Sequence, residues 1–300
     1  MEALILTPDS APLTRDIADY PEGIIIPIDK PYRWTSADVI RKIKYAAIRH
    51  FGKKNLKVGH AGTLDPLATG VLLVCIGKAT KLAEELQSHD KEYIAGVTFG
   101  ATTPSYDLEK EIDRFFPHEH ITAEDVQETL PTFLGEQDQI APLFSAKSVD
   151  GVRAYELARK LHKEGKTLDE AAQELIRTAR INISGLELLT FEGGSGRGLQ
   201  DNPSHFVGPS PCGQGGSTVL QAAATSASSR INVTDNSALG LPRAVIRMAC
   251  SKGTYVRAFA RDLGEALGSG AHLDSLQRSR SGQFRVENTL SVEQALQKLQ

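Results

Sequence analysis

The residues of this chain best placed to do chemistry gather in one stretch, KVGHAGTLDPLATGVLLVCIGKATK, from Lys57 to Lys81. It puts a carboxylate, Asp65, directly before a proline and just upstream of the apolar run VLLVCI, with a histidine, His60, a few residues earlier. Glycines around them permit tight turns or close approach of a ligand to the backbone. An aspartate there can act as a nucleophile or stabilise an oxocarbenium-like centre, as in glycosidic-bond chemistry. An ordinary Asp-Pro turn is the alternative, and composition does not decide between them.

Several other chemistries are not supported by the sequence. The segment GKAT is not a phosphate-binding loop, because Leu72 stands where a glycine is needed and Ala79 where a hydroxyl is needed. No G-x-S-x-G segment and no metal-ligand spacing occurs. The three cysteines, Cys75, Cys212 and Cys250, are too far apart for a zinc site or a disulfide framework. With no signal peptide or membrane span either, we expect a soluble, cytoplasmic protein without a bound metal.

The net charge of -3 hides an uneven distribution. Residues 41–57 carry seven Lys or Arg and no acid, and residues 243–285 carry eight against three acids. Residues 107–138 reverse this balance with ten acids. Each run alone is usually a solvated face. Two basic zones in an otherwise acidic chain instead favour a phosphate-rich ligand.

Hydrophobic periodicity and capping residues predict the elements that position the candidate residues. Strands are expected at 23–30, 91–100, 179–191 and 242–251. A helix starts near Thr35 or Ser36 with Asp38, and another near Thr122 with Asp125. Residues 151–165 are predicted to be helical, as is a segment from Thr254, the expected N-cap, to about Leu267.

Two segments are expected to lie outside this framework. Residues 1–21 form a tail or an edge segment. Residues 193–240 contain nine Gly, eight Ser and five Ala among 48, which cannot bury much apolar surface. A flexible insertion is therefore predicted there.

Arg257 falls in the first turn of the last predicted helix, where a cation opposes the helix dipole. Such a residue should have an anionic partner nearby. Together with Asp65 and the strand tyrosine Tyr93, it permits glycosyl-bond chemistry without selecting it.

The chemical stretch resembles the catalytic motif of the TruB-type tRNA pseudouridine synthases, G-H-x-G-T-L-D-P-x-A-x-G-x-L. IDKPYRWTS resembles the family's D-K-P-x-G-x-T-S segment, and DKEYIAGVTFGATT its K-x-Y strand. APLFSAKSVDGVRAYELAR and CSKGTYVRAFARDLGEALGSGAHLDSLQRSRSGQF resemble two further family motifs. The five motifs occur in the family's order and cover most of residues 24–285 apart from the insertion.

The resemblance implies an α+β pseudouridine-synthase fold with a mixed, largely antiparallel sheet flanked by helices. One catalytic domain would span 22–300, interrupted by 193–240. The implied substrate is the uridine at position 55 in the T-loop (T-arm) of tRNA, bound by a monomer without redox cofactor, metal or nucleotide. The implied catalytic residues are Asp65 as the carboxylate, Tyr93 stacking on the base and Arg257 keeping Asp65 ionised. The implied substrate-binding residues are His60, Tyr255 and Leu276, with Lys30 positioning the loop or RNA.

The sequence also departs from the family pattern. TPSYDLEKEI replaces a D-T-x-D-x-x-G segment, YRW replaces a glycine turn at 32–34, and AP replaces a double proline at 141–142. Because the sequence ends at Gln300, no C-terminal PUA domain is expected. Two alternatives stay open: a non-catalytic RNA-binding or tRNA-folding protein, and a ribosome-associated protein acting through the insertion.

Overall fold

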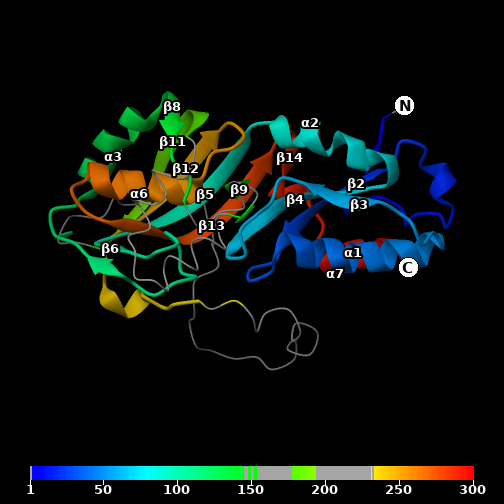
Figure 1. Ribbon diagram of the computed structural model, residues 1–300, viewed down its shortest axis with the longest axis horizontal. Helices are drawn as coiled ribbons and strands as arrows, with labels where there is room; N and C mark the ends of the chain where they lie inside the picture. The colour runs from blue at the N-terminus through cyan, green and yellow to red at the C-terminus, as the bar shows by residue number, and fades with distance from the viewer. Residues whose placement is uncertain are drawn as a thin grey trace.

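The computed structural model describes residues 2–142, 144, 148–149, 152–153, 178–193, 231 and 233–300. One ten-stranded sheet runs through the length of the molecule (Figure 1). Its main path has the order β1 (Leu4–Ile5), β2 (Ile24–Lys30), β4 (Ala68–Ile76), β13 (Ala271–Ser281), β5 (Lys91–Phe99), β12 (Arg243–Cys250), β11 (Ala179–Glu192) and β8 (Gly135–Gln139). Off this path, β3 (Val58–Ala61) pairs with β4, and β14 (Phe284–Arg285) pairs with β13. Among the described ladders of this sheet, β1–β2 and β4–β13 alone are parallel, so the expected mixed, largely antiparallel sheet is confirmed.

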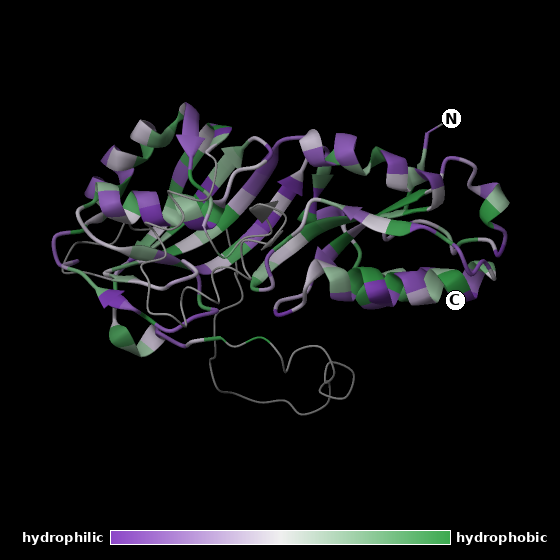
Figure 2. Ribbon diagram, viewed as in Figure 1, coloured by the Kyte–Doolittle hydropathy of each residue, from purple (hydrophilic) through white to green (hydrophobic). Residues whose placement is uncertain are grey.

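Helices cover both faces of this sheet. The larger apolar cluster joins one sheet face to α1 (Ser36–Phe51), α3 (Ala123–Thr129), α6 (Val256–Ala266) and α7 (Val292–Lys298). A smaller cluster lies on the other face under α2 (Ala83–Ser88). Alternate residues of β4 enter the two clusters, as the twofold repeat of a strand requires. Figure 2 shows that hydrophilic and hydrophobic residues recur along α1, as in an amphipathic helix.

Two short two-stranded sheets accompany the main one, β6 (Ala101–Thr102) with β7 (Arg114–Phe115) and β9 (Ser148–Val149) with β10 (Val152–Arg153). The second pair corrects the predicted helix at 151–165, because its start at Val152–Arg153 is extended. The rest of that predicted helix lies outside the described residues. The β-branched Val152 favours a strand locally, and this preference outweighs the helical pattern at these two residues.

Local capping signals predict most helix starts correctly. Thr35 caps α1 in a capping box with Asp38, and Thr122 caps α3 in the same way with Asp125. The helix predicted from Thr254 to about Leu267 is confirmed as α6, but its N-cap is Tyr255, one residue later than expected. The Thr254 hydroxyl instead donates to the Ser251 carbonyl at 3.0 Å.

A short parallel ladder joins two halves of the sheet. The β4 half consists of β1 to β4 with α1, α2 and α7, and the β13 half consists of β13, β5, β12, β11 and β8 with α3 and α6. The ladder between them has three residue pairs, Leu276 with Ala68, Gln277 with Thr69 and Arg278 with Gly70. A Cβ on Gly70 would lie 2.3 Å from the Arg278 carbonyl oxygen, so the two strands approach this closely because position 70 is glycine.

The first residues and the end of the predicted insertion are attached to this framework. β1 pairs with β2, and Leu6 is fully buried, so residues 2–21 take the edge position. Most of 193–240 lies outside the described residues, but Thr234 donates its N–H to the Leu108 carbonyl at 2.8 Å. In the described part of the chain, no helix has the length and apolar character needed to span a membrane.

Candidate active site

Asp65 lies on the short loop between β3 and β4, and two neighbours fix that loop. The hydroxyl of Ser36, the first residue of α1, accepts the N–H of Leu64 at 3.0 Å. The Asp65 carbonyl accepts the N–H of Ala68 at 3.1 Å as β4 begins. The Asp65 side chain nevertheless keeps 40% of its surface exposed. The loop therefore presents a carboxylate that is held in place and still accessible.

Arg257 is the partner that the sequence predicts for this carboxylate. Its Nε donates to Asp65 Oδ2 at 2.9 Å, while Nη1 and Nη2 donate to the carbonyls of Ser105 at 3.0 Å and Phe144 at 2.8 Å. The side chain is buried on α6. Burial alone would lower the pKa of Arg257, but the carboxylates of Asp65 and Asp107 outweigh it and the pKa is raised. The guanidinium is thus a fixed positive charge beside Asp65.

A second carboxylate, Asp107, faces the same guanidinium and was missed by sequence reasoning. Its Oδ2 lies 3.8 Å from Arg257 Nε, and its Oδ1 accepts the Ser105 hydroxyl at 2.6 Å and the Glu109 N–H at 3.0 Å. Burial raises the pKa of Asp107, and Arg257 only partly offsets this. Asp107 lies in TPSYDLEKEI, the segment that replaces the family's D-T-x-D-x-x-G pattern, so no motif pointed to it. One guanidinium therefore serves two carboxylates, one exposed and one buried.

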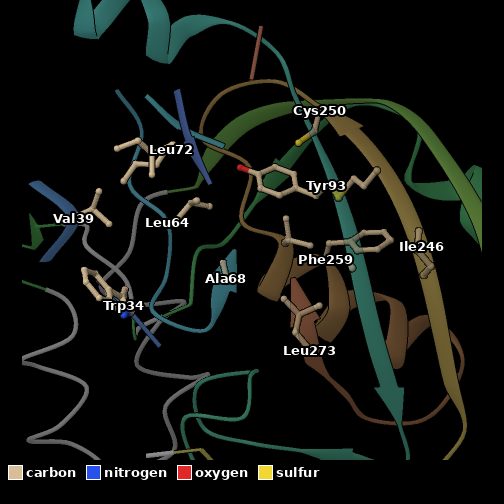
Figure 3. Packing of buried hydrophobic residues seen from close by; sticks show 14 of the residues in the cluster. Trp34, Val39, Leu64, Ala68, Leu72, Tyr93, Ile246, Cys250, Phe259 and Leu273 are labelled. Carbon is tan, nitrogen blue, oxygen red and sulfur yellow. The ribbon is translucent and has the colours of Figure 1, made fainter. Parts of the chain in front are cut away.

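Tyr93 lies on β5 opposite Arg278 of β13. Its ring is packed in the larger apolar cluster, and Figure 3 shows the hydroxyl pointing toward the side where Leu64 and Leu72 lie. Burial raises the pKa of this phenol, so it stays protonated at neutral pH. Arg278 is fully enclosed and donates from Nε to the Val71 carbonyl at 2.7 Å and from Nη2 to the Gly62 carbonyl at 3.0 Å.

Lys30 is buried at the end of β2 and ties two loops together. Its ammonium donates to the carbonyls of Pro31 at 2.9 Å, Trp34 at 2.6 Å and Pro66 at 3.2 Å. Burial lowers its pKa to about 7, against the opposing effect of Asp65. Of the two roles expected for Lys30, this geometry favours positioning the catalytic loop, because a fully buried ammonium does not reach RNA.

The segment YRW, at 32–34, contains a backbone conformation typical of glycine. Arg33 has φ +63°, a left-handed value that glycine adopts without strain. Its Nη2 donates to the Ile231 carbonyl at 2.8 Å. A non-glycine residue therefore occupies a left-handed position at this turn.

The three other predicted substrate-binding residues lie at different depths. Leu276 lines a cavity of about 20 Å³ together with Asp65, Asp107 and Arg257, which is room for about one water molecule. His60 is half-buried on β3. Burial is the main reason that its pKa is lowered, and the positive charge of Arg278 lowers it further. Tyr255 does not line this cavity; its backbone N–H donates to the side-chain oxygen of buried Gln139 at 2.8 Å.

A basic hollow adjoins β3 outside this cavity. It measures about 500 Å³, and Lys44, Lys54 and Lys57 lie on its rim with Gly59 and Thr80. Its lysines come from the basic run at 41–57. Strand β3 leads from this hollow directly to the Asp65 loop, so the positive surface and the carboxylate lie along one edge of the sheet.

The mixed ten-stranded sheet flanked by helices is the α+β fold of the pseudouridine synthases. The fold is similar to a chain in the crystal structure of a Cbf5-Nop10-Gar1 complex, with a TM-score of 0.53 and 22% identity. That similarity covers 98% of this chain, which spans 62% of that chain's length.

Comparison of sequences then gives the family. Residues 49–193 match the model of the TruB family pseudouridylate synthase N-terminal domain. The chain is 46% identical over 275 residues to tRNA pseudouridine synthase B of Phocaeicola vulgatus, covering 92% of each protein. It is 44% identical to the protein of that name from Bacteroides thetaiotaomicron, again over 92% of each. The chain therefore belongs to the TruB family of pseudouridylate synthases, and the family, fold and enzyme class expected from the motifs are confirmed.

Proposed function

We propose that this enzyme converts uridine to pseudouridine at position 55 in the T-loop of tRNA, with Asp65 as the nucleophile. Relatives named tRNA pseudouridine synthase B, similar along 92% of the chain, support tRNA as the substrate. The observation that carries the proposal is the Asp65 carboxylate, accessible and paired at 2.9 Å with a buried guanidinium.

The reaction is an isomerisation, so it needs no oxidant or reductant. The Asp65 carboxylate bonds to the ribose or to the uracil, and the bond between C1′ and N1 breaks. The base turns, a bond forms between C1′ and C5, and the bond to Asp65 breaks, which restores the free carboxylate. The proton on C5 is lost and N1 gains one. Arg257 keeps Asp65 ionised and aimed. Tyr93 stacks on the base and, as a protonated phenol, can pass a proton.

The target base must leave its stack to reach Asp65, which costs a few kcal/mol. The basic hollow at Lys44, Lys54 and Lys57 offers phosphate contacts that offset this cost. Binding should therefore weaken as salt rises. We further propose that the enzyme acts on tRNA in the cytoplasm and does so as a monomer.

The proposal is tested with T-arm RNA carrying tritium at C5 of the target uridine. Asp65→Asn keeps the size of the side chain and removes its charge, so tritium release should fall at least about 1,000-fold. The RNA dissociation constant should stay within about threefold. Asp138→Asn, at an exposed carboxylate on β8, is the matched control and should retain full activity.

Two outcomes separate the alternatives. Absence of tritium release from the wild-type protein, with RNA still bound, would support the non-catalytic RNA-binding protein. Loss of activity on replacing residues 194–230 with a short linker would support a protein that acts through the insertion. On the proposed function, that replacement leaves turnover intact.

A further inference from the structure

Strand β13 contains a bulge beside the catalytic cavity. The register of β13 against β5 skips Asp274; after it, Leu276 pairs with Ala95 and Arg278 with Tyr93. Side chains alternate between the two faces of a sheet, so one extra residue exchanges the faces of all that follow. Without the bulge, Leu276 and Arg278 would turn away from the Tyr93 face. The bulge therefore decides which β13 side chains meet the site.

The Asp274 carboxylate holds this bulge by binding three adjacent strands together. Its Oδ2 accepts Arg243 Nε at 2.6 Å and the Thr98 hydroxyl at 2.8 Å. Its Oδ1 accepts Arg243 Nη2 at 2.9 Å and the Ser275 hydroxyl at 2.7 Å. Arg243 belongs to β12, Thr98 to β5 and Asp274 to β13. The forked guanidinium and the two hydroxyls thus give this carboxylate four donors in a fixed geometry.

Gly96 of β5 makes room for this network. A Cβ at position 96 would lie 2.2 Å from Asp274 Oδ1, 2.3 Å from the Ser275 hydroxyl oxygen and 2.5 Å from Arg243 Nη2. These separations are too short for any side chain. The network and glycine 96 therefore form one unit, and either can be altered to disrupt the other.

The bulge acts on the site through two residues. Leu276 lines the cavity with Asp65, Asp107 and Arg257. Arg278 donates to the carbonyl of Gly62, at the start of the segment that leads to Asp65. Both take part in the three-pair ladder that joins the halves of the sheet. A slip of β13 would displace the cavity wall and release the catalytic loop together.

We propose that Asp274, clamped by Arg243 and seated over Gly96, is a positioning residue for the isomerisation, because it fixes the bulge that turns Leu276 and Arg278 toward Asp65. This inference rests on the proposed function. Asp274 borders the same cavity as Asp65, but both of its carboxylate oxygens are engaged by Arg243, Thr98 and Ser275. It therefore acts by setting the register of the strand between the two halves of the active site.

The test is single-turnover tritium release with T-arm RNA, measured well below the melting temperature of each variant. Asp274→Ala should slow the chemical step about 10- to 100-fold, because misplacement of site residues by about 1 Å reduces rates on this scale. The RNA dissociation constant should change less than threefold. Arg243→Lys keeps the charge without the fork and should give a smaller loss.

Ser279→Ala is the matched control. Ser279 donates to Glu92 Oε1 at 2.8 Å beside the second register shift of β13, which follows Arg278. Loss of the Ser279 hydroxyl removes a hydrogen bond from the same strand and leaves Leu276 and Arg278 on the same face of the sheet. The single-turnover rate of this variant should stay within twofold of the wild type.

A double-mutant cycle with Gly96→Ala separates positioning from general loosening. If both changes break the same unit, the double variant should be about as slow as the slower single variant. A double variant whose rate loss equals the product of the two single losses would overturn the proposal. So would an Asp274→Ala rate within twofold of the wild type.

A readout independent of activity is the nuclear Overhauser contact between Leu276 and Ala95. In Asp274→Ala this contact should be replaced by one between Ser275 and Ala95, and an unchanged pattern would overturn the proposal. If the wild-type enzyme forms no pseudouridine, the proposed function fails, while this contact still decides whether Asp274 sets the register.

Discussion

The two halves of the sheet contribute to the active site in different ways. The β4 half supplies Asp65, which is accessible and sits on a loop tied down by buried Lys30. The β13 half supplies Arg257, Asp107 and Tyr93, all of them buried. The reacting group and the groups that control its charge thus come from different segments around one packed sheet.

This difference shows where the enzyme is sensitive. The larger apolar cluster runs through both halves, and the backbone link between them beside the site is the three-pair ladder of β4 and β13. A change inside one half should mainly alter stability. A change at the junction, or in a residue that reaches across it, should alter the chemical step.

Arg257 reaches across the junction, so its loss should have the largest effect on rate. Arg257→Gln leaves two carboxylates without their shared cation and should slow tritium release about 100- to 1,000-fold. Arg257→Lys restores a charge but not the three-way fork, and should recover part of the rate. Equal activity of the wild type and Arg257→Gln would remove the ion pair from the mechanism.

Gly70 lies in the junction itself, with φ +95° and a Cβ position 2.3 Å from the Arg278 carbonyl oxygen. Gly70→Ala should force β4 and β13 apart and reduce the free energy of unfolding by about 3 kcal/mol or more. Gly59→Ala is the control, because the nearest atom to its Cβ would be Thr80 Cγ2 at 4.0 Å. Chemical denaturation should show a change below about 0.5 kcal/mol there.

Each half of the sheet has a helix that begins with a Thr-Asp capping box, so matched variants in these two boxes compare the halves directly. Thr35→Ala in the β4 half and Thr122→Ala in the β13 half should each lower the free energy of unfolding by about 1 kcal/mol. Only Thr35→Ala should also reduce activity, because α1 begins beside the loop of Asp65 through Ser36. Equal activity in the two variants would show that the start of α1 does not control the loop.

Lys30, on β2 of the β4 half, gives the smallest expected effect, which is a pH dependence of the free energy of unfolding. Burial lowers the pKa of Lys30 to about 7 from its ordinary 10.5, so the unfolded chain binds more protons between these values. The contribution of Lys30 to stability must then rise with pH across that window. The difference in unfolding free energy between wild type and Lys30→Met should increase from pH 7 to 9. A constant difference would show that burial does not shift this pKa.

How much the sequence predicts depends on how local the signal is. Thr35 with Asp38, and the strand at Lys91–Phe99, can be found because each depends on residues close in the chain. The position of Arg257 in a first helical turn predicted an anionic partner, and the motif resemblance implied that this partner is Asp65. The motif resemblance then supplied the remaining site residues.

What the sequence did not predict depends on long-range geometry. Asp107 approaches Arg257 across 150 residues of chain, in a segment that departs from the family motif. Asp274 occupies an unspecified position of the last motif, and the bulge it holds arises from three strands that only meet in the fold. Thr254 was a plausible cap by residue type, but its hydroxyl found a nearer acceptor in the Ser251 carbonyl.

The small size of the cavity beside Asp65 has a consequence for discrimination in the cell. With room for about one water molecule, it must widen before a uracil ring can enter. Free uridine brings no phosphodiester chain to compensate for that opening, whereas a folded RNA does so at many points on the basic surface. The enzyme should therefore ignore the pool of loose nucleosides, even though they carry the same reactive bond.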